Sequence, residues 1–148
     1  TMLVYGIFSI LSEIRGNGEA LVGYAKIPML IGLAGWTYVA AIGITITNWA
    51  GGDAGAFITI WGAGQAAQIM FSLGFTAAFL AIASRDEYNS TLAYIAAAIA
   101  LLATILSIVQ LVTNDGNTAA TMGSIVGITY IIHTIYAIYL GRGLLARA

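Results

Sequence analysis

Long charge-free stretches, separated by brief polar segments, set the pattern of the chain. Four stretches contain no charged side chain: residues 27–52, 54–84, 88–114 and 116–141. A helix rises about 1.5 Å per residue, so about 20 apolar residues cross the roughly 30 Å hydrocarbon core of a bilayer. Every stretch exceeds that length. The pattern therefore predicts transmembrane helices over about residues 29–50, 57–84, 91–113 and 119–141.

A shorter apolar segment precedes these spans over residues 1–14, where 12 residues come before the first charge at Glu13. It is too short for an ordinary span. Three interpretations are open: the end of a longer helix, a helix lying in the membrane interface, or a tilted fifth span. The Gly-Asn-Gly sequence after Arg15 predicts a turn. We expect Pro28 in the first turn of the next helix, where its missing N–H is tolerated.

The connections between the predicted spans are short, at about residues 50–56, 85–90 and 114–118. Loops of this length join only neighbouring antiparallel helices. We therefore predict an all-α integral membrane protein with a single domain over residues 1–148. Its fold is expected to be an up-down bundle of four transmembrane helices plus the short N-terminal helix.

The basic side chains indicate how this bundle is oriented. All five fall on one side of it: Arg15, Lys26, Arg85, Arg142 and Arg147. The two connections on the other side carry only the acidic residues Asp53 and Asp115. Because cytoplasmic loops of membrane proteins are enriched in lysine and arginine, we expect the 85–90 loop and the C-terminus to be cytoplasmic.

Composition narrows the classes of function and partner. The chain is 60% hydrophobic and 7% charged, against about 25% charged residues in ordinary soluble domains. Its net charge of -1 argues against nucleic acid as a partner, because phosphates require a basic face. The sequence contains no cysteine, which removes thiolate metal sites and thiol catalysis. Membrane lipids and other membrane protein subunits are the expected partners.

The polar side chains within the predicted spans are uncharged, since no Asp, Glu, Lys or Arg lies deep within them. This absence disfavours proton-driven and ion-coupled transport, which relies on embedded charges. One face of the central span carries a row of polar and aromatic residues: Trp61, Gln65, Gln68, Ser72 and Thr76. Unpaired amides in an apolar medium are costly. We expect them to bond to Ser107 and Gln110, or to line a site for a polar headgroup, a quinone carbonyl or a neutral solute.

His133 is the only histidine and lies near Tyr130 on the last predicted span. An imidazole there can ligate haem iron, hydrogen-bond a quinone or titrate. One histidine cannot complete a bis-histidine haem site, so we expect no metal or cofactor from this chain alone. The alternative is a neutral histidine that bonds across the bundle. Trp36, Trp61 and Tyr130 lie deeper in the predicted spans than the aromatic residues near the span ends, and we expect them to pack in the core or against pigments or lipids.

Small residues recur at helical spacing. Two pairs stand four residues apart, Gly62 with Ala66 and Gly123 with Gly127. Small residues allow helix backbones to approach closely, which matters because lipid tails remove the usual hydrophobic drive between helices. The pairs favour either packing within the bundle or a face for another subunit.

Two functions fit these patterns. The first is a structural or accessory subunit of a larger membrane complex, such as a respiratory or other redox assembly. The second is a small channel, transporter or binder for a neutral or amphipathic ligand such as a quinone or a lipid. No buried carboxylate accompanies His133 to form a serine-type triad, so we expect no catalytic activity of its own and assign no catalytic residue.

Overall fold

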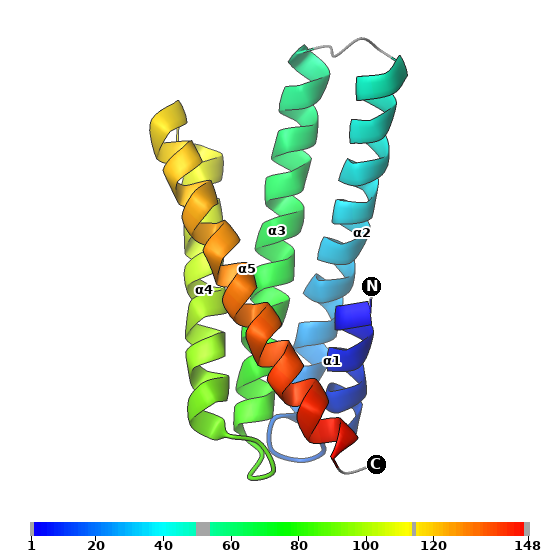
Figure 1. The fold of residues 1–148 in the computed structure, drawn as a ribbon, viewed down its shortest axis with the longest axis vertical. Helices are drawn as coiled ribbons and strands as arrows, with labels where there is room; N and C mark the ends of the chain where they lie inside the picture. Colours follow the sequence, from blue (N-terminus) through cyan, green and yellow to red (C-terminus); the bar gives the residue numbers. More distant parts are fainter. Residues whose placement is uncertain (1, 50–53, 114, 147–148) are drawn as a thin grey trace.

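The structure, a computed structural model, describes residues 2–49, 54–113 and 115–146. These residues form five helices and no strand (Figure 1): α1 (Met2–Glu13), α2 (Glu19–Trp49), α3 (Ala54–Ala83), α4 (Ser90–Val112) and α5 (Gly116–Leu145). Helices α2 to α5 are long and apolar enough to cross a membrane. The all-helical fold with four such helices, predicted from the charge-free stretches, is confirmed. Asp53 and Arg147, which entered the orientation argument, lie outside the described residues.

Helix α3 stands at the centre of the bundle, with α2 packed on one side and α4 on the other. Successive long helices run in opposite directions, as the short connections predict (Figure 1). Helix α5 starts beside the end of α4, crosses the bundle obliquely and meets α1 near its other end. The bundle is therefore wider at the end where α5 begins than at the end where it finishes.

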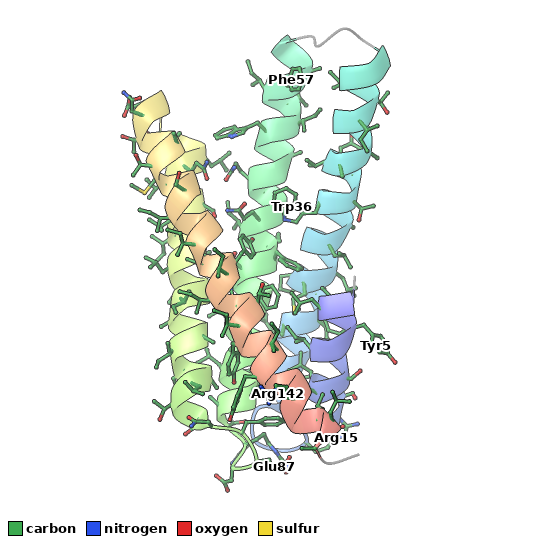
Figure 2. The ribbon with its side chains drawn as sticks, viewed as in Figure 1. Tyr5, Arg15, Trp36, Phe57, Glu87 and Arg142 are labelled. Atoms are coloured by element: carbon green, nitrogen blue, oxygen red, sulfur yellow. The ribbon has the colours of Figure 1, made fainter. Side chains whose placement is uncertain are left out.

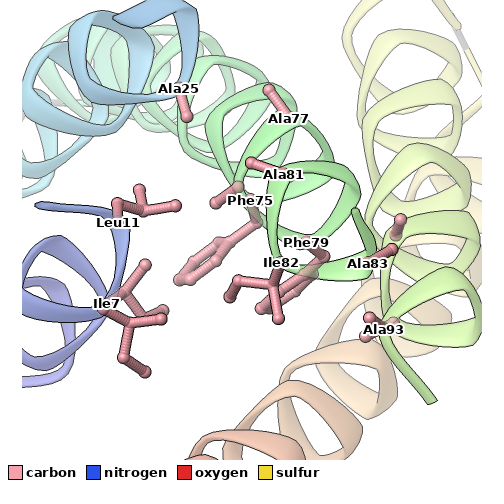
Figure 3. Packing of buried hydrophobic residues seen from close by; sticks show 14 of the residues in the cluster. Ile7, Leu11, Ala25, Phe75, Ala77, Phe79, Ala81, Ile82, Ala83 and Ala93 are labelled. Carbon is pink, nitrogen blue, oxygen red and sulfur yellow. The ribbon is translucent and has the colours of Figure 1, made fainter. Parts of the chain in front are cut away.

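Helix α1 fills only part of the height of the bundle. Its 12 residues rise about 18 Å, which is less than the hydrocarbon core of a bilayer. The helix stands beside α2 and contacts α2, α3 and α5. Ile7 and Leu11 are buried in one apolar cluster with Phe75 and Ile82 of α3 (Figure 3). Within the described residues, the segment predicted over residues 1–14 is a 12-residue helix packed into the narrow end of the bundle.

A tight turn joins α1 to α2 and ties both to the end of α3. Gly16 and Gly18 have φ angles of 73° and 90°, a region that favours glycine. The Gly16 N–H donates to the Glu19 carboxylate over 3.1 Å. The Ser84 hydroxyl, at the end of α3, donates to the Asn17 carbonyl over 3.0 Å. The turn predicted from Gly-Asn-Gly is therefore present and anchored on both sides.

Helix α2 begins earlier than the apolar pattern predicts. It starts at Glu19, so Pro28 lies inside the helix, and the prediction that it occupies the first turn is wrong. The early turns extend the helix because Val22 and Ala25 are buried in the apolar cluster. Packing of these side chains offsets the intrahelical hydrogen bond that proline cannot make.

Glycines bring α2 and α3 into close contact. A Cβ at Gly32 would stand 2.8 Å from the Ala67 carbonyl oxygen, and one at Gly35 would stand 2.6 Å from the Ala67 Cβ. From the opposite helix, a Cβ at Gly74 would stand 3.0 Å from the Ala25 carbonyl oxygen. Real side chains do not fit at most of these separations. The small residues therefore set how closely the two backbones approach.

The two small-residue pairs noted in the sequence lie in different surroundings. Gly62 and Gly127 have open space where a Cβ would stand, and Ala66 is exposed. Gly123 instead faces the side chain of Gln110. Among the residues that the structure describes, Gly62 and Gly127 therefore mediate no close helix contact.

Hydrogen-bonding side chains begin α4 and α5. Asn89 accepts from the Leu92 N–H over 3.0 Å. Asp115 accepts from the hydroxyl and, over 2.9 Å, from the N–H of Thr118. These bonds, the one from the hydroxyl foremost, hold the pKa of the Asp115 carboxyl below its ordinary value of 3.8. A carboxylate at this position also suits the positive end of the helix dipole.

Charged side chains gather at the narrow end of the bundle. Figure 2 places Arg15, Glu87 and Arg142 at this end. Arg85 and Glu87, in the turn between α3 and α4, form an ion pair. Arg15 and Arg142, which the sequence assigns to one side of the bundle, thus share one end of the fold.

The close packing at Gly32 predicts a loss of stability when one methyl group is added. In Gly32→Ala the new Cβ meets Phe71 and the Ala67 carbonyl, and we expect the free energy of unfolding to fall by about 1–3 kcal/mol, as in overpacked cores. Unfolding in mild detergent with increasing dodecyl sulfate, followed by circular dichroism, measures this change.

Gly23→Ala is the matched control, because it lies on the same helix and its Cβ meets open space. Alanine is the better helix former, so this variant should equal or exceed the unmodified protein in stability. An equal loss in both variants would contradict the close contact at Gly32.

Candidate functional site

All the glutamines of the chain, Gln65, Gln68 and Gln110, line one cleft. The cleft has a volume of about 500 Å³ and lies between the four long helices. Its walls include residues of α2, α3 and α5: Trp36, Phe71, Val126 and Tyr130. Within the described chain, its lining carries no charged side chain. The cleft is thus polar but neutral, and it belongs to the wider half of the bundle.

The antiparallel pairing of α3 and α4 explains why the glutamines meet. Gln65 and Gln68 lie in the first half of α3, about one turn apart and on the same face. Gln110 lies in the last turn of α4, three residues after Ser107. In antiparallel helices, the first half of one lies beside the last half of the other. Residues 65–68 and 107–110 therefore stand at the same level.

One glutamine is bonded across the bundle. Gln68 Nε2 donates to the Ser107 hydroxyl over 2.8 Å, and that hydroxyl donates to the Ala103 carbonyl over 2.7 Å. Gln68 and Ser107 are both buried. A hydrogen bond between the polar row of α3 and Ser107, one of the two arrangements expected from the sequence, is therefore present.

The other two glutamines have unsatisfied amide oxygens. Gln65 Oε1 and Gln110 Oε1 are buried and accept no hydrogen bond from any residue that the structure describes. Each residue is only 8% exposed. Leaving such a group without a partner costs about 1–3 kcal/mol. A neutral hydrogen-bonding group that enters the cleft would remove this cost.

Gly123 makes room for one of these amides. A Cβ at Gly123 would stand 2.7 Å from Gln110 Nε2. A larger residue on α5 would push the Gln110 side chain aside. Gly127, one turn further along, lines the cleft as well. This small-residue pair therefore shapes the cleft from the α5 side.

His133 lies behind the cleft in a cage of aromatic rings. Its ring centroid is 5.7 Å from that of Phe75, 5.5 Å from that of Phe79 and 6.2 Å from that of Tyr130. The residue is 2% exposed and is not among those that line the cleft. Phe75 and Phe79 pack against the imidazole, and both of its ring nitrogens are buried without a hydrogen-bond partner among the described residues. Tyr130, by contrast, lines the cleft, with its hydroxyl facing Ser72.

An apolar groove adjoins the cleft at Trp36 and Gln65. It has a volume of about 530 Å³ and is walled by apolar side chains of α2 and α3, including Phe57, Ile58 and Trp61. Trp36 and Trp61 are 38% and 42% exposed. Both indoles are partly exposed and form the groove, so the expectation that they pack in the core is wrong, while the alternative, packing against a lipid or pigment, remains compatible with this position.

The chain matches no protein-family model, no curated protein and no solved structure. Its function is therefore inferred from the chemistry of the cleft and the groove. Three amides and a tyrosine hydroxyl supply donors and acceptors without net charge. No cluster of three or more metal-ligating side chains occurs in the part of the chain that the structure describes. The arrangement suits a molecule with a neutral polar head and an apolar tail.

The sequence predicts the amides of the cleft but not its apolar walls. Phe71 and Val126 complete the lining, yet apolar side chains occur at every turn of these helices and carry no distinguishing pattern. Trp36 is different. Tryptophan in a predicted span usually lies near a membrane interface, so an indole nearer the middle of the span departs from that placement. That departure is the signal that could have identified the groove.

The Gln68–Ser107 bond predicts energetic coupling between the two side chains. In a double-mutant cycle of Gln68→Leu and Ser107→Ala, we expect a coupling free energy of about 0.5–1.5 kcal/mol, the range for hydrogen bonds between membrane helices. Unfolding in mixed detergent micelles gives the stabilities of the four proteins. Strictly additive effects would show that the bond contributes nothing to the fold.

Proposed function

We propose that this protein is a multi-pass integral membrane protein that binds a neutral amphipathic molecule of the quinone type between its helices. The observation that carries the proposal is the pair of buried, unsatisfied amide oxygens of Gln65 and Gln110 in one cleft. The three glutamines of the chain meet at one cleft, and two of them keep a buried oxygen without a partner among the described residues. A ligand that hydrogen-bonds there would supply these partners.

The outer surface of the helices supports insertion into a membrane. Large aliphatic side chains point outward along the long helices, among them Ile58, Ile105 and Ile131, each at least half exposed. Apolar surface of this extent is unfavourable in water and is matched by lipid tails. The end that carries Arg15 and Arg142 is then cytoplasmic by the positive-inside rule, together with the 85–90 loop and the C-terminus.

The cleft and the groove together match the two parts of a quinone. Rotation about the last side-chain bond exchanges the oxygen and nitrogen of an amide, so Gln65 and Gln110 can accept from a hydroxyl or donate to a carbonyl. Trp36 and Phe71 offer aromatic surfaces beside these amides. The apolar groove starts at Gln65 and provides about 530 Å³ for a hydrocarbon tail. The lack of charge in the lining suits a neutral head.

Binding of decylubiquinone tests this function. We expect it to quench the fluorescence of Trp36 and Trp61 in a Trp49→Phe protein, since both indoles line the proposed site. Replacing Gln65 and Gln110 together by leucine should raise the Kd about tenfold or more, because the hydrogen bonds to the head are lost. Titration in mild detergent measures both values.

Thr45→Val is the matched control for this experiment. Thr45 is exposed on α2, and its hydroxyl donates to the Ala41 carbonyl of its own helix. Its loss should leave the Kd within about twofold of the unmodified protein, as for surface substitutions away from a site. Absence of quenching, or an unchanged Kd in the leucine variant, would rule out quinone binding at the glutamines.

The open face of α3 favours a second candidate function, that of an accessory subunit in a larger membrane complex such as a respiratory or other redox assembly. Gly62 and Ala66 lie one turn apart on this face, and none of the described residues fills the space where a Cβ of Gly62 would stand. A helix of another subunit can approach closely at such a position. Gly62 lines neither the cleft nor the groove, although Ile58, one turn earlier on the same face, is part of the groove wall.

Substitution of Gly62 tests the accessory role. Gly62→Ile should release the protein from a native complex extracted in mild detergent, because the new side chain occupies the path of the partner helix. Ile58→Val, on the same face one turn earlier, should leave the complex intact. Migration on a native gel reports both. Unchanged migration of Gly62→Ile would count against a partner at this face.

A further inference from the structure

A second cleft lies at the narrow, charged end of the bundle, among residues that the glutamine cleft does not use. It has a volume of about 530 Å³ and is formed by the turn between α3 and α4 and the last turns of α5. Glu87, Tyr88, Tyr139 and Arg142 supply its polar groups. Figure 2 places Glu87 and Arg142 at the same end of the molecule. This cleft therefore brings one negative and one positive side chain to one site.

The chemistry of this cleft changes from charged to apolar along its length. Ile135 and Ile138 of α5 continue the lining, and they are 62% and 60% exposed. An adjoining apolar groove of about 270 Å³ shares Ile135 and Tyr139 with the cleft and runs between α4 and α5, past Ile95. The combined surface is charged at the end of the bundle and apolar toward its middle. A phospholipid shows the same change, from a charged headgroup to an apolar acyl chain.

The two charges fit different parts of a headgroup. Arg142 forms no ion pair with any residue that the structure describes, and its guanidinium presents paired N–H donors of the geometry that phosphate oxygens accept. Glu87 accepts from Arg85, which offsets its charge, and its carboxylate also lines the cleft as a hydrogen-bond acceptor. A headgroup with phosphate alone would engage Arg142 but bring no cation to this acceptor. A zwitterion with both charges complements the pair.

We infer that this cleft binds an aminophospholipid of the phosphatidylethanolamine class. The phosphodiester accepts hydrogen bonds from Arg142, and the primary ammonium donates to Glu87. One acyl chain lies along Ile135 and Ile138 and continues in the groove beside α4. Phosphatidylcholine lacks N–H donors for Glu87, and phosphatidylglycerol lacks the cation. The inference is independent of quinone binding, because the two sites share no lining residue.

Native mass spectrometry of the delipidated protein in mild detergent tests this site. Dioleoyl-phosphatidylethanolamine, -phosphatidylglycerol and -phosphatidylcholine are each titrated, and the retained lipid is measured as collision energy rises. We expect phosphatidylethanolamine to be retained best. Arg142→Gln should lower the retention of phosphatidylethanolamine and phosphatidylglycerol alike, by about fivefold, since each basic side chain near a headgroup contributes on that scale. Glu87→Gln should abolish the preference for phosphatidylethanolamine without lowering the retention of phosphatidylglycerol.

Three control variants separate this site from general lipid adhesion. Arg15→Gln removes a cation from the same end of the bundle but outside the cleft, and should leave the preference unchanged. The combined leucine variant of Gln65 and Gln110 should do the same, which keeps this result distinct from quinone binding. Arg142→Lys keeps the positive charge but lacks the planar guanidinium, so this variant should retain phosphatidylethanolamine less well than the unmodified protein and better than Arg142→Gln. It also tests the site if Arg142→Gln fails to fold.

The outcomes that would overturn the inference are specific. Equal retention of the three lipids would mean that the headgroup is not recognised. Better retention of phosphatidylglycerol would indicate a basic patch without a role for Glu87. Full retention of phosphatidylethanolamine by both Arg142→Gln and Arg142→Lys would show that the phosphate is not held at Arg142.

Discussion

The packing of α3 against α2 and α4 is the constraint on which the rest of the structure depends, because these two helix pairs share the most extensive contacts in the bundle. At Gly32 and Gly74 the backbones of α2 and α3 approach so closely that a larger side chain does not fit. Helix α5 runs obliquely, close to α1 at one end and beside α4 at the other. At the α1 end, Leu11 of α1 is buried in one apolar cluster with Phe79 of α3 and Leu140 of α5. The wider half, at the other end, contains the glutamine cleft.

The position of the glutamines follows from the cost of unpaired polar groups. Gln68 meets this cost by bonding to Ser107, whereas Gln65 and Gln110 each keep one buried oxygen without a partner in the described chain. A fully packed bundle would replace such residues with aliphatic side chains at no loss of stability. Their presence beside an open volume, together with the exposed indole of Trp36, is better explained by binding than by folding.

The two sites divide the molecule by charge. Neutral amides occupy the wide half, where removing the neutral headgroup of a ligand from water costs less free energy than removing a charged one. Charged groups are restricted to the narrow end, where Arg142 and Glu87 line a cleft that continues into the apolar groove between α4 and α5. A phospholipid bound there would lie against the outer side of α5, the helix that also forms a wall of the glutamine cleft. The lipid and the ligand would therefore contact opposite surfaces of one helix.

The sequence by itself determined the helical class, the four apolar spans, the grouping of Arg15 with Arg142 and the polar row on α3, because hydropathy, charge and helical spacing are properties of neighbouring residues. It also singled out the glutamines, since amides in apolar stretches are conspicuous. Only the tertiary structure decided that Gln68 bonds across the bundle while one amide oxygen each of Gln65 and Gln110 has no partner among the described residues, that Trp36 is partly exposed, and that α1 packs against the narrow end of the bundle. These outcomes depend on how far helices rotate, cross and approach, and at Gly32 and Gly74 that approach is set by contacts between residues about forty positions apart in the chain.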